Sequence, residues 1–134
     1  GGKLAVEAVE ERQKSEAKEE VIQEIDALRH NQSEEVAKII WTFVVHENEK
    51  FRYAALDALS YRRIDAWLFS RLSERLYLEK DPSVLSLVIR NIGRVEQGLA
   101  TQAMLELEVF AAKCGATELC QLAKEQAEVI KRKL

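Results

Sequence analysis

The sequence predicts an all-α protein, a right-handed α-solenoid of about three antiparallel helix pairs with an extra charged helix at its N-terminus. Among its 134 residues, 47% are hydrophobic and 32% are charged, with one Pro and five Gly. Turn-forming residues are therefore too scarce for a many-stranded sheet protein, whereas the abundant Ala, Leu, Glu and Lys favour helices. Apolar residues also recur at helical spacing, and similar positions return after 33 residues, as expected for stacked helix pairs.

The N-terminal stretch, residues 3–20, is highly charged. It has a short apolar stripe at one end: Leu4, Ala5, Ala8 and Val9. Between residues 10 and 20 only Ala17 is apolar, and a packed helix needs an apolar face along its whole length. We therefore assign residues 1–20 to a charged lead-in or a poorly buried helix, and residues 21–134 to a helical repeat domain.

The first helices of the repeat domain follow from stripes and caps. An apolar stripe that begins at Val21 predicts that the first helix continues to about Arg29. Ser33, followed by two glutamates, is a good start for the next helix. The segment 34–47 is apolar on nearly all sides, so we expect it to form the most buried helix. Asn48 caps the next helix, and a further amphipathic helix follows through residues 64–80.

The second half of the chain contains the clearest boundary signals. Asp81 is a cap, and Pro82 occupies the first helical position, where its missing N–H has no intrahelical partner to lose. Gly93 lies near the end of that helix, and Gly115 ends the following one. The last helix finishes in three basic residues, as the helix dipole favours.

Shifting the chain by 33 residues aligns one helix with a later one. Asn48 then falls on Asp81, Phe51 on Val84, and Leu59 on Ile92. The same shift places Leu72 on Leu105 and, in the other direction, on Ile39. From these matched positions we expect six side chains to be nearly fully buried: Trp41, Leu59, Leu72, Val88, Ile92 and Leu105.

One stretch also resembles a known family. The pattern is an Asp-Pro pair, an apolar anchor, and then apolar-Arg-x-apolar-Gly-Arg-apolar, carried by Asp81, Pro82, Val84, Ile89, Arg90, Ile92, Gly93, Arg94 and Val95. It resembles the second helix of short bacterial HEAT-like repeats. The earlier copy keeps Arg52, Ala54, Ala55 and Leu59 but lacks the Pro and the Gly, and the resemblance covers roughly residues 34–115. It implies a HEAT-like solenoid; such proteins are mostly binding scaffolds, with minorities of bilin lyases and DNA glycosylases.

Patterns typical of catalysis or of metal binding are missing from the sequence. His30 and His46 stand sixteen residues apart, without the spacing of a metal motif. No Gly-rich phosphate loop is present, so we expect no enzyme activity, no cofactor and no metal. Cys114 and Cys120 do not form a zinc or C-x-x-C pattern. We expect them to be reduced, mostly buried thiols of a cytoplasmic protein without a membrane span.

The candidate site is a set of polar residues beside the apolar stripes. Tyr53, Asp57 and Tyr61 lie at i, i+4 and i+8 of one helix, and the 33-residue shift carries them to Ser86, Arg90 and Arg94. Second helices of a solenoid stack into a continuous binding surface, and Tyr and Arg are enriched at binding hot spots. We therefore assign partner binding to Tyr53, Asp57, Tyr61, Arg90 and Arg94. The alternative is that Arg90 and Asp57 form ion pairs between repeats.

A non-catalytic scaffold that binds a protein or peptide is the expected function. The alternative is a HEAT-like domain associated with nucleic acid. A group of arginines, Arg62, Arg63, Arg71 and Arg75, could bind an acidic peptide or phosphates, but a group spread over a turn and a helix is more often ordinary surface. The net charge is −3, and a phosphate-binding groove requires Lys and Arg clustered along one face. We therefore expect no nucleic-acid partner. The sequence leaves the partner and the oligomeric state open.

Overall fold

The protein is all-α in the computed structural model, which describes residues 2–115 and 117–134. The described helices, seven α-helices and two short 3-10 helices (η), are α1 (Gly2–Ala27), η1 (Leu28–His30), α2 (Glu34–Val44), α3 (Glu49–Leu59), α4 (Ala66–Leu78), α5 (Pro82–Ile92), η2 (Gln97–Leu99), α6 (Ala100–Cys114) and α7 (Glu118–Lys133). The described residues contain no strand, and one isolated bridge pairs Ile64 with Val95. The all-α prediction is confirmed.

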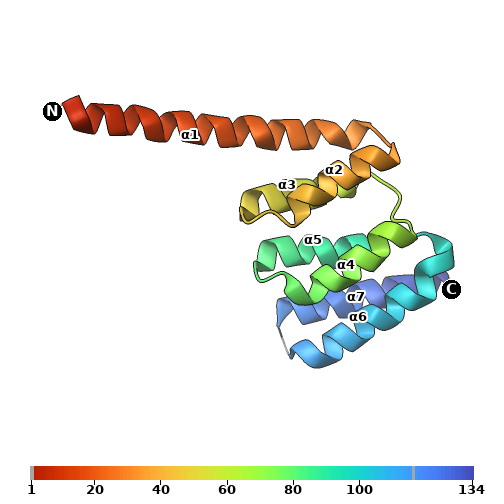
Figure 1. Ribbon diagram of the computed structural model, residues 1–134. Coiled ribbons are helices and arrows are strands. Elements are labelled where there is room, and N and C mark those ends of the chain that lie inside the picture. Colours follow the sequence, from red (N-terminus) through yellow and green to blue (C-terminus); the bar gives the residue numbers. More distant parts are fainter. Residues whose placement is uncertain (1, 116) are drawn as a thin grey trace. The chain divides into compact units, whose positions relative to one another are not determined.

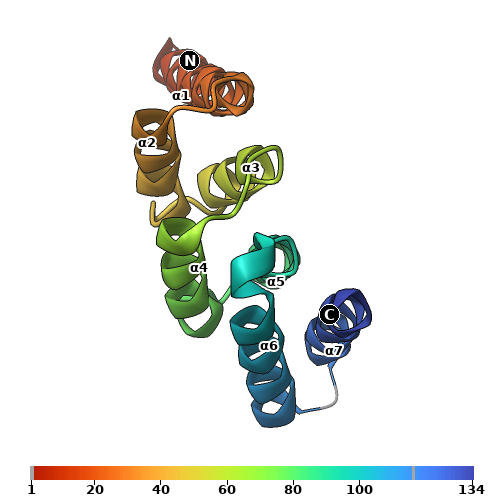
Figure 2. The ribbon, with the colours of Figure 1, turned by 90° about the vertical axis from the view of Figure 1, so that its right-hand side faces the viewer.

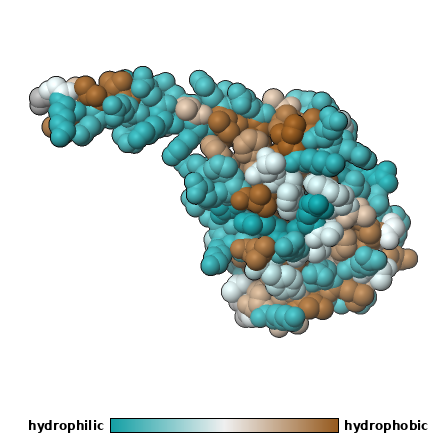
Figure 3. Space-filling view, in the orientation of Figure 1, coloured by the Kyte–Doolittle hydropathy of each residue, from teal (hydrophilic) through white to brown (hydrophobic). Residues whose placement is uncertain are grey.

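The chain forms two compact units, Gly1–Ala58 and Leu59–Leu134. In the first unit, α1 is one continuous helix of 26 residues (Figure 1). Residues 2–20 are all exposed, and the helix has its first buried residue at Ile25. Figure 3 shows hydrophobic side chains at the start of α1 and hydrophilic ones along its middle. Of the two alternatives, a charged lead-in or a poorly buried helix, the described residues 2–20 form an exposed helix.

In the second unit, helices pack on their sequence neighbours, and α5 also packs on α7. Helix α5 contacts α4 and α7, and α6 contacts α7 along its length. Figure 2 shows α4 beside α5, and α6 beside α7. Several short helices of the chain can therefore bury an apolar face only by packing against one another.

The helix boundaries arise largely from the predicted caps. The Ser33 hydroxyl accepts from Val36 N–H, and the Asp81 carboxylate accepts from Val84 N–H at 3.0 Å, with Pro82 at the start of α5. Gly115 ends α6 with a φ of 87°, a conformation that a residue with a Cβ adopts only with strain. These three boundaries agree with the sequence-based expectation.

In two pairs of helices, buried residues lie at a constant separation in the sequence. Helices α3 and α5 bury equivalent residues 33 positions apart: Phe51 and Val84, Ala55 and Val88, Leu56 and Ile89, Leu59 and Ile92. For α2 and α4 the separation is 32: Val36 and Leu68, Ala37 and Phe69, Ile40 and Leu72, Val44 and Leu76. The shift of 33 predicted for all helices therefore holds only for α3 and α5.

This difference corrects part of the predicted core. Leu59, Leu72, Val88 and Ile92 are fully buried, as predicted, but Leu105 is 51% exposed and Trp41 is only half-buried. Each residue advances the helix by about 100°. Aligning two helices with a wrong shift therefore matches a buried position of one helix with a surface position of the other. In α6 the buried positions are Ala100, Ala103, Leu107 and Phe110. Similarly, α2 is not the most buried helix: it buries four residues and α5 six.

The cysteines also differ from the expectation. Cys114 and Cys120 are joined in a disulfide, with their Cα atoms 5.9 Å apart, instead of being reduced thiols. Cys114 ends α6, and Cys120 lies in the first turn of α7, so the reversal of the chain after Gly115 brings them together. The Thr117 hydroxyl lies 2.9 Å from the Cys120 sulfur.

We predict that Leu72→Ala lowers the free energy of unfolding by about 2–5 kcal/mol, because it removes a fully buried side chain and leaves a cavity. The matched control is Leu105→Ala in the exposed position, which should change stability by less than about 0.5 kcal/mol. Urea denaturation of both variants measures the difference. Equal effects would mean that the two leucines are equally buried.

Candidate functional site

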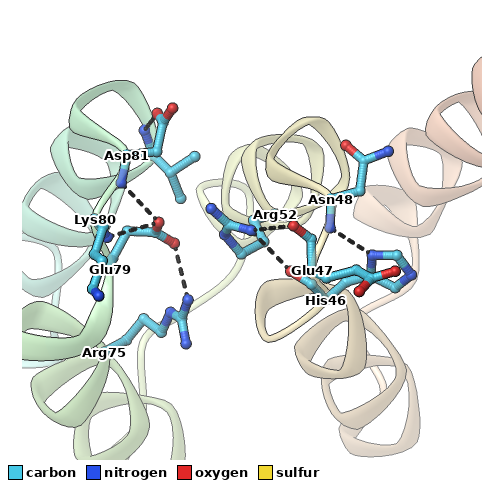
Figure 4. Close-up of polar contacts among 9 residues, drawn as sticks. His46, Glu47, Asn48, Arg52, Arg75, Glu79, Lys80 and Asp81 are labelled. Atoms are coloured by element: carbon cyan, nitrogen blue, oxygen red, sulfur yellow. Dashed lines mark hydrogen bonds and ion pairs between the residues drawn. The ribbon is translucent and has the colours of Figure 1, made fainter.

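The turn before α3 is fixed by polar contacts (Figure 4). The Asn48 N–H donates to His46 Nδ1 at 2.9 Å, and the Asn48 side-chain oxygen accepts from Lys50 N–H at 2.9 Å. The Arg52 guanidinium donates to the carbonyls of His46 and Glu47 at 3.0 and 2.8 Å. Together these bonds hold the first turn of α3, and with it the side chains that follow.

The turn before α5 has a comparable arrangement, also drawn in Figure 4. The Glu79 carboxylate is buried and accepts from the N–H groups of Lys80 and Asp81, each at 3.1 Å. Arg75 of α4 pairs with it at 3.2 Å. A buried carboxylate is costly unless it is paired and hydrogen-bonded, and these contacts satisfy it. They also set where α5 starts.

In the first unit, α1 and α3 enclose a groove of about 480 Å³. Its lining residues are Ile22, Gln23, Asp26, Lys50, Tyr53, Ala54 and Asp57. The Tyr53 side chain is exposed at its edge. The lining combines two carboxylates, Asp26 and Asp57, and one ammonium, Lys50, with apolar side chains, so the groove is suited to a segment with apolar and basic side chains.

In the second unit, α5 and α7 enclose a groove of about 530 Å³. Its lining residues are Pro82, Ser83, Ser86, Arg90, Glu118, Leu119, Gln121, Leu122 and Glu125. This groove is more polar than the first, and its charged side chains are Arg90, Glu118 and Glu125. Here too the carboxylates outnumber the basic groups.

The predicted site residues fall into three groups. Tyr53 and Asp57 line the first groove, and Arg90 lines the second. Tyr61 is exposed but lines neither of these grooves. The sequence interpretation missed the opposite walls, supplied by Ile22 and Asp26 of α1 and by the start of α7. These residues are distant in sequence from α3 and α5, and no motif connects them.

Arg94 is held within the second unit. Its guanidinium donates to the side-chain oxygen of Asn91 at 2.9 Å and to the carbonyl of Arg62 at 2.8 Å. Burial lowers the pKa of the Arg94 guanidinium below its ordinary value. Asn91 is itself buried, so Arg94 connects the end of α5 to the turn before α4. Arg94 therefore contributes to the fold through hydrogen bonds, and neither of these bonds is an ion pair.

The four arginines considered for phosphate binding also have contacts within the second unit. Arg75 pairs with Glu79, Arg63 pairs with Glu96, and the Arg71 guanidinium lies 3.7 Å above the Trp67 ring. Arg62 is buried, and this burial lowers the pKa of its guanidinium, opposed by the charge of Asp65. These contacts disfavour a shared phosphate site.

The described residues, 2–115 and 117–134, contain neither a cluster that could bind a metal nor a helix that could span a membrane. Among them, no group of three or more His, Cys, Asp or Glu side chains is placed to hold a metal ion. None of the described helices is long and apolar enough to cross a membrane. No protein-family model, curated protein or solved structure matches this chain. Inference about function therefore rests on the two grooves and on the residues that line them.

We predict different effects for the two arginines of the candidate site. Arg94→Ala removes the partner of a buried Asn side chain, so it should lower the free energy of unfolding by about 1–3 kcal/mol. Arg90→Ala, in the exposed arginine one turn earlier, should change it by less than about 0.5 kcal/mol. Thermal and urea denaturation test both. An unaffected Arg94→Ala variant would contradict the structural role.

Proposed function

We propose that the chain is a HEAT-like solenoid of antiparallel helix pairs that binds a protein segment along its second helices, without catalysis. In this proposal α2 with α3, α4 with α5, and α6 with α7 are successive pairs, and α1 precedes them. The partner-binding residues are Tyr53 and Asp57 at the groove of the first unit and, separately, Arg90 at the groove of the second unit. Tyr61 and Arg94 line neither of these two grooves, and Arg94 instead bonds to the Asn91 side chain and to the Arg62 carbonyl.

Two features of the pairs support this proposal. Helices α3 and α5 bury side chains at the same positions, 33 residues apart. The turns before them also use equivalent residues: the N–H of Asn48 donates to His46, and that of Asp81 donates to Glu79. A repeated turn and a repeated buried face are expected when one helix pair recurs along a chain.

The positions of the groove-lining residues support the proposed binding of a protein segment. Lys50, Tyr53 and Asp57 of α3 line one groove, and Ser83, Ser86 and Arg90 of α5 line the other. Each residue of the first set precedes its counterpart by 33 residues. The same helical positions thus form a hollow in each unit, as expected of a binding surface built from repeats.

The charges in both grooves favour a protein partner over nucleic acid. Carboxylates outnumber basic groups in each lining, and phosphates would be repelled by them. A segment that combines apolar residues with Lys or Arg would match both the apolar floor and the carboxylates. The preferred ligand is therefore a basic, amphipathic peptide.

Selection from a random peptide library tests this proposal. The protein should enrich peptides that combine apolar with basic residues. Tyr53→Ala and Asp57→Lys should weaken their binding by about tenfold or more, because truncating a hot-spot residue costs more than about 1.4 kcal/mol of binding free energy. Tyr77→Ala, which removes an exposed tyrosine of α4, is the matched control.

Circular dichroism of each variant separates lost binding from lost folding. Enrichment of acidic peptides, or equal binding by the Tyr53→Ala and Tyr77→Ala variants, would contradict the proposal. Tighter binding of an oligonucleotide than of any selected peptide would favour the nucleic-acid alternative.

A further inference from the structure

The disulfide of the second unit joins the end of α6 to the start of α7. Cys114 is the last residue of α6, and Cys120 lies in the first turn of α7, six residues later, with the two Cα atoms 5.9 Å apart. A covalent bond across so short a loop restrains both of its ends. The disulfide therefore holds the first turn of α7 close to the end of α6.

The restrained turn of α7 forms part of one wall of the second groove, the groove between α5 and α7. Glu118 and Leu119, which directly precede Cys120, line this groove, and so does Gln121, which follows it. A change in the position of this turn would therefore change the groove. The lining of the first groove belongs entirely to the first unit and has no residue near the disulfide.

The other restraint at the start of α7 is Thr117. Its hydroxyl accepts from the Cys120 N–H at 3.4 Å, a longer bond than the 3.0 Å cap of α5. The rest of α7 is anchored separately, because Ala123, Ala127 and Ile130 are buried beyond the first turn. Helix ends are also where local opening costs least. Loss of the disulfide should therefore loosen the first turn of α7 and leave the remainder of the helix packed.

The two sulfur atoms differ in access and in their surroundings. Cys114 is half-buried, whereas Cys120 is only 4% exposed, so an incoming thiol reaches Cys114 more readily. Cys120 is suited to be the leaving thiolate, because it lies at the positive end of the α7 dipole and 2.9 Å from the Thr117 hydroxyl, which can donate to it. A further hollow of about 430 Å³, lined partly by Thr117 and Cys120, gives a small dithiol room beside the pair.

We propose that the Cys114–Cys120 disulfide is a reversible redox switch: a dithiol reduces it, the first turn of α7 loosens, and binding in the second groove weakens. This inference rests on the proposed function in one respect, that the second groove takes a protein segment, and it adds how that groove is regulated. The first groove is outside the control of the switch.

The reduction is a pair of thiol–disulfide exchanges. A thiolate of the dithiol attacks the Cys114 sulfur, the bond between the two cysteines breaks, and its electron pair leaves on Cys120, which takes a proton from water. The second thiolate of the dithiol then attacks the reductant sulfur of the mixed disulfide and releases Cys114, which is protonated in turn. The reductant gives up two electrons and becomes a cyclic disulfide. The same steps in reverse, with a disulfide as oxidant, close the switch.

Dithiothreitol added to the full, folded chain tests the switch directly. Alkylation with iodoacetamide and mass spectrometry should detect no free thiol before the addition and two afterwards, without denaturant. Hydrogen exchange at the N–H groups of Cys120 and Gln121, which both donate to Thr117, should then accelerate by at least about tenfold, while the amides of α5 remain protected. The double variant Cys114→Ser with Cys120→Ser is the matched control. It should exchange like the reduced chain whether or not dithiothreitol is present.

Peptide binding tests the effect on the groove. Peptides selected on the oxidised chain are assigned to the second groove when Glu125→Lys weakens them, and to the first when Asp57→Lys does. Reduction should weaken the second-groove peptides by about tenfold or more. Binding of the first-groove peptides should not change, which controls for effects of the reagent. Circular dichroism checks that the reduced chain and each variant remain helical.

Reduction that requires denaturant would overturn this inference, because the disulfide would then be a permanent bond of the fold. Unchanged exchange at Cys120 and Gln121 in the reduced chain would also overturn it, as would equal binding of second-groove peptides in both states. A failure of the proposed function looks different. A chain that binds no peptide in either state rejects that function, and the exchange measurement alone then decides whether the disulfide controls the start of α7.

Discussion

The structure depends on helices that are too short to be stable alone. Helices α2, α3 and α5 have 11 residues each, and isolated helices of this length are marginal in water because nucleation is costly. Each therefore needs neighbours to cover one apolar stripe. The stripe occupies only part of the helix surface, so the residues beside it stay accessible. In α3 and α5, those flanking positions are the ones that line the grooves.

Local sequence signals predicted much of the fold. Ser33, Asp81 with Pro82, and Gly115 each act through contacts within one turn of the chain, so they could be recognised without a structure. The register between distant helices was harder to predict. Leu105 was matched to Leu72 by a shift that holds for α3 and α5 but not for α6, and the error moved it from the core to the surface. Whether two cysteines meet also depends on the turn geometry between them.

The candidate site was predicted only in part. Tyr53, Asp57 and Arg90 were identified because they flank an apolar stripe, which is a periodic signal. The opposite walls, from α1 and α7, have no such signal, because they are created by packing between segments distant in sequence. Arg94 looked equivalent to Arg90 in the sequence, yet its bonds to Asn91 and to the Arg62 carbonyl give it a role in the fold. Only the structure distinguishes these two arginines.

The proposed solenoid requires that α2 with α3 and α4 with α5 are two copies of one helix pair that present the same positions to a partner. A crystal structure of the chain tests this requirement most directly, by superposition of residues 34–59 on residues 66–92. The two pairs should superpose with Tyr53 over Ser86 and Asp57 over Arg90, each at the edge of a groove. Different crossing angles in the two pairs, with Tyr53 and Ser86 on different sides of their helices, would contradict it.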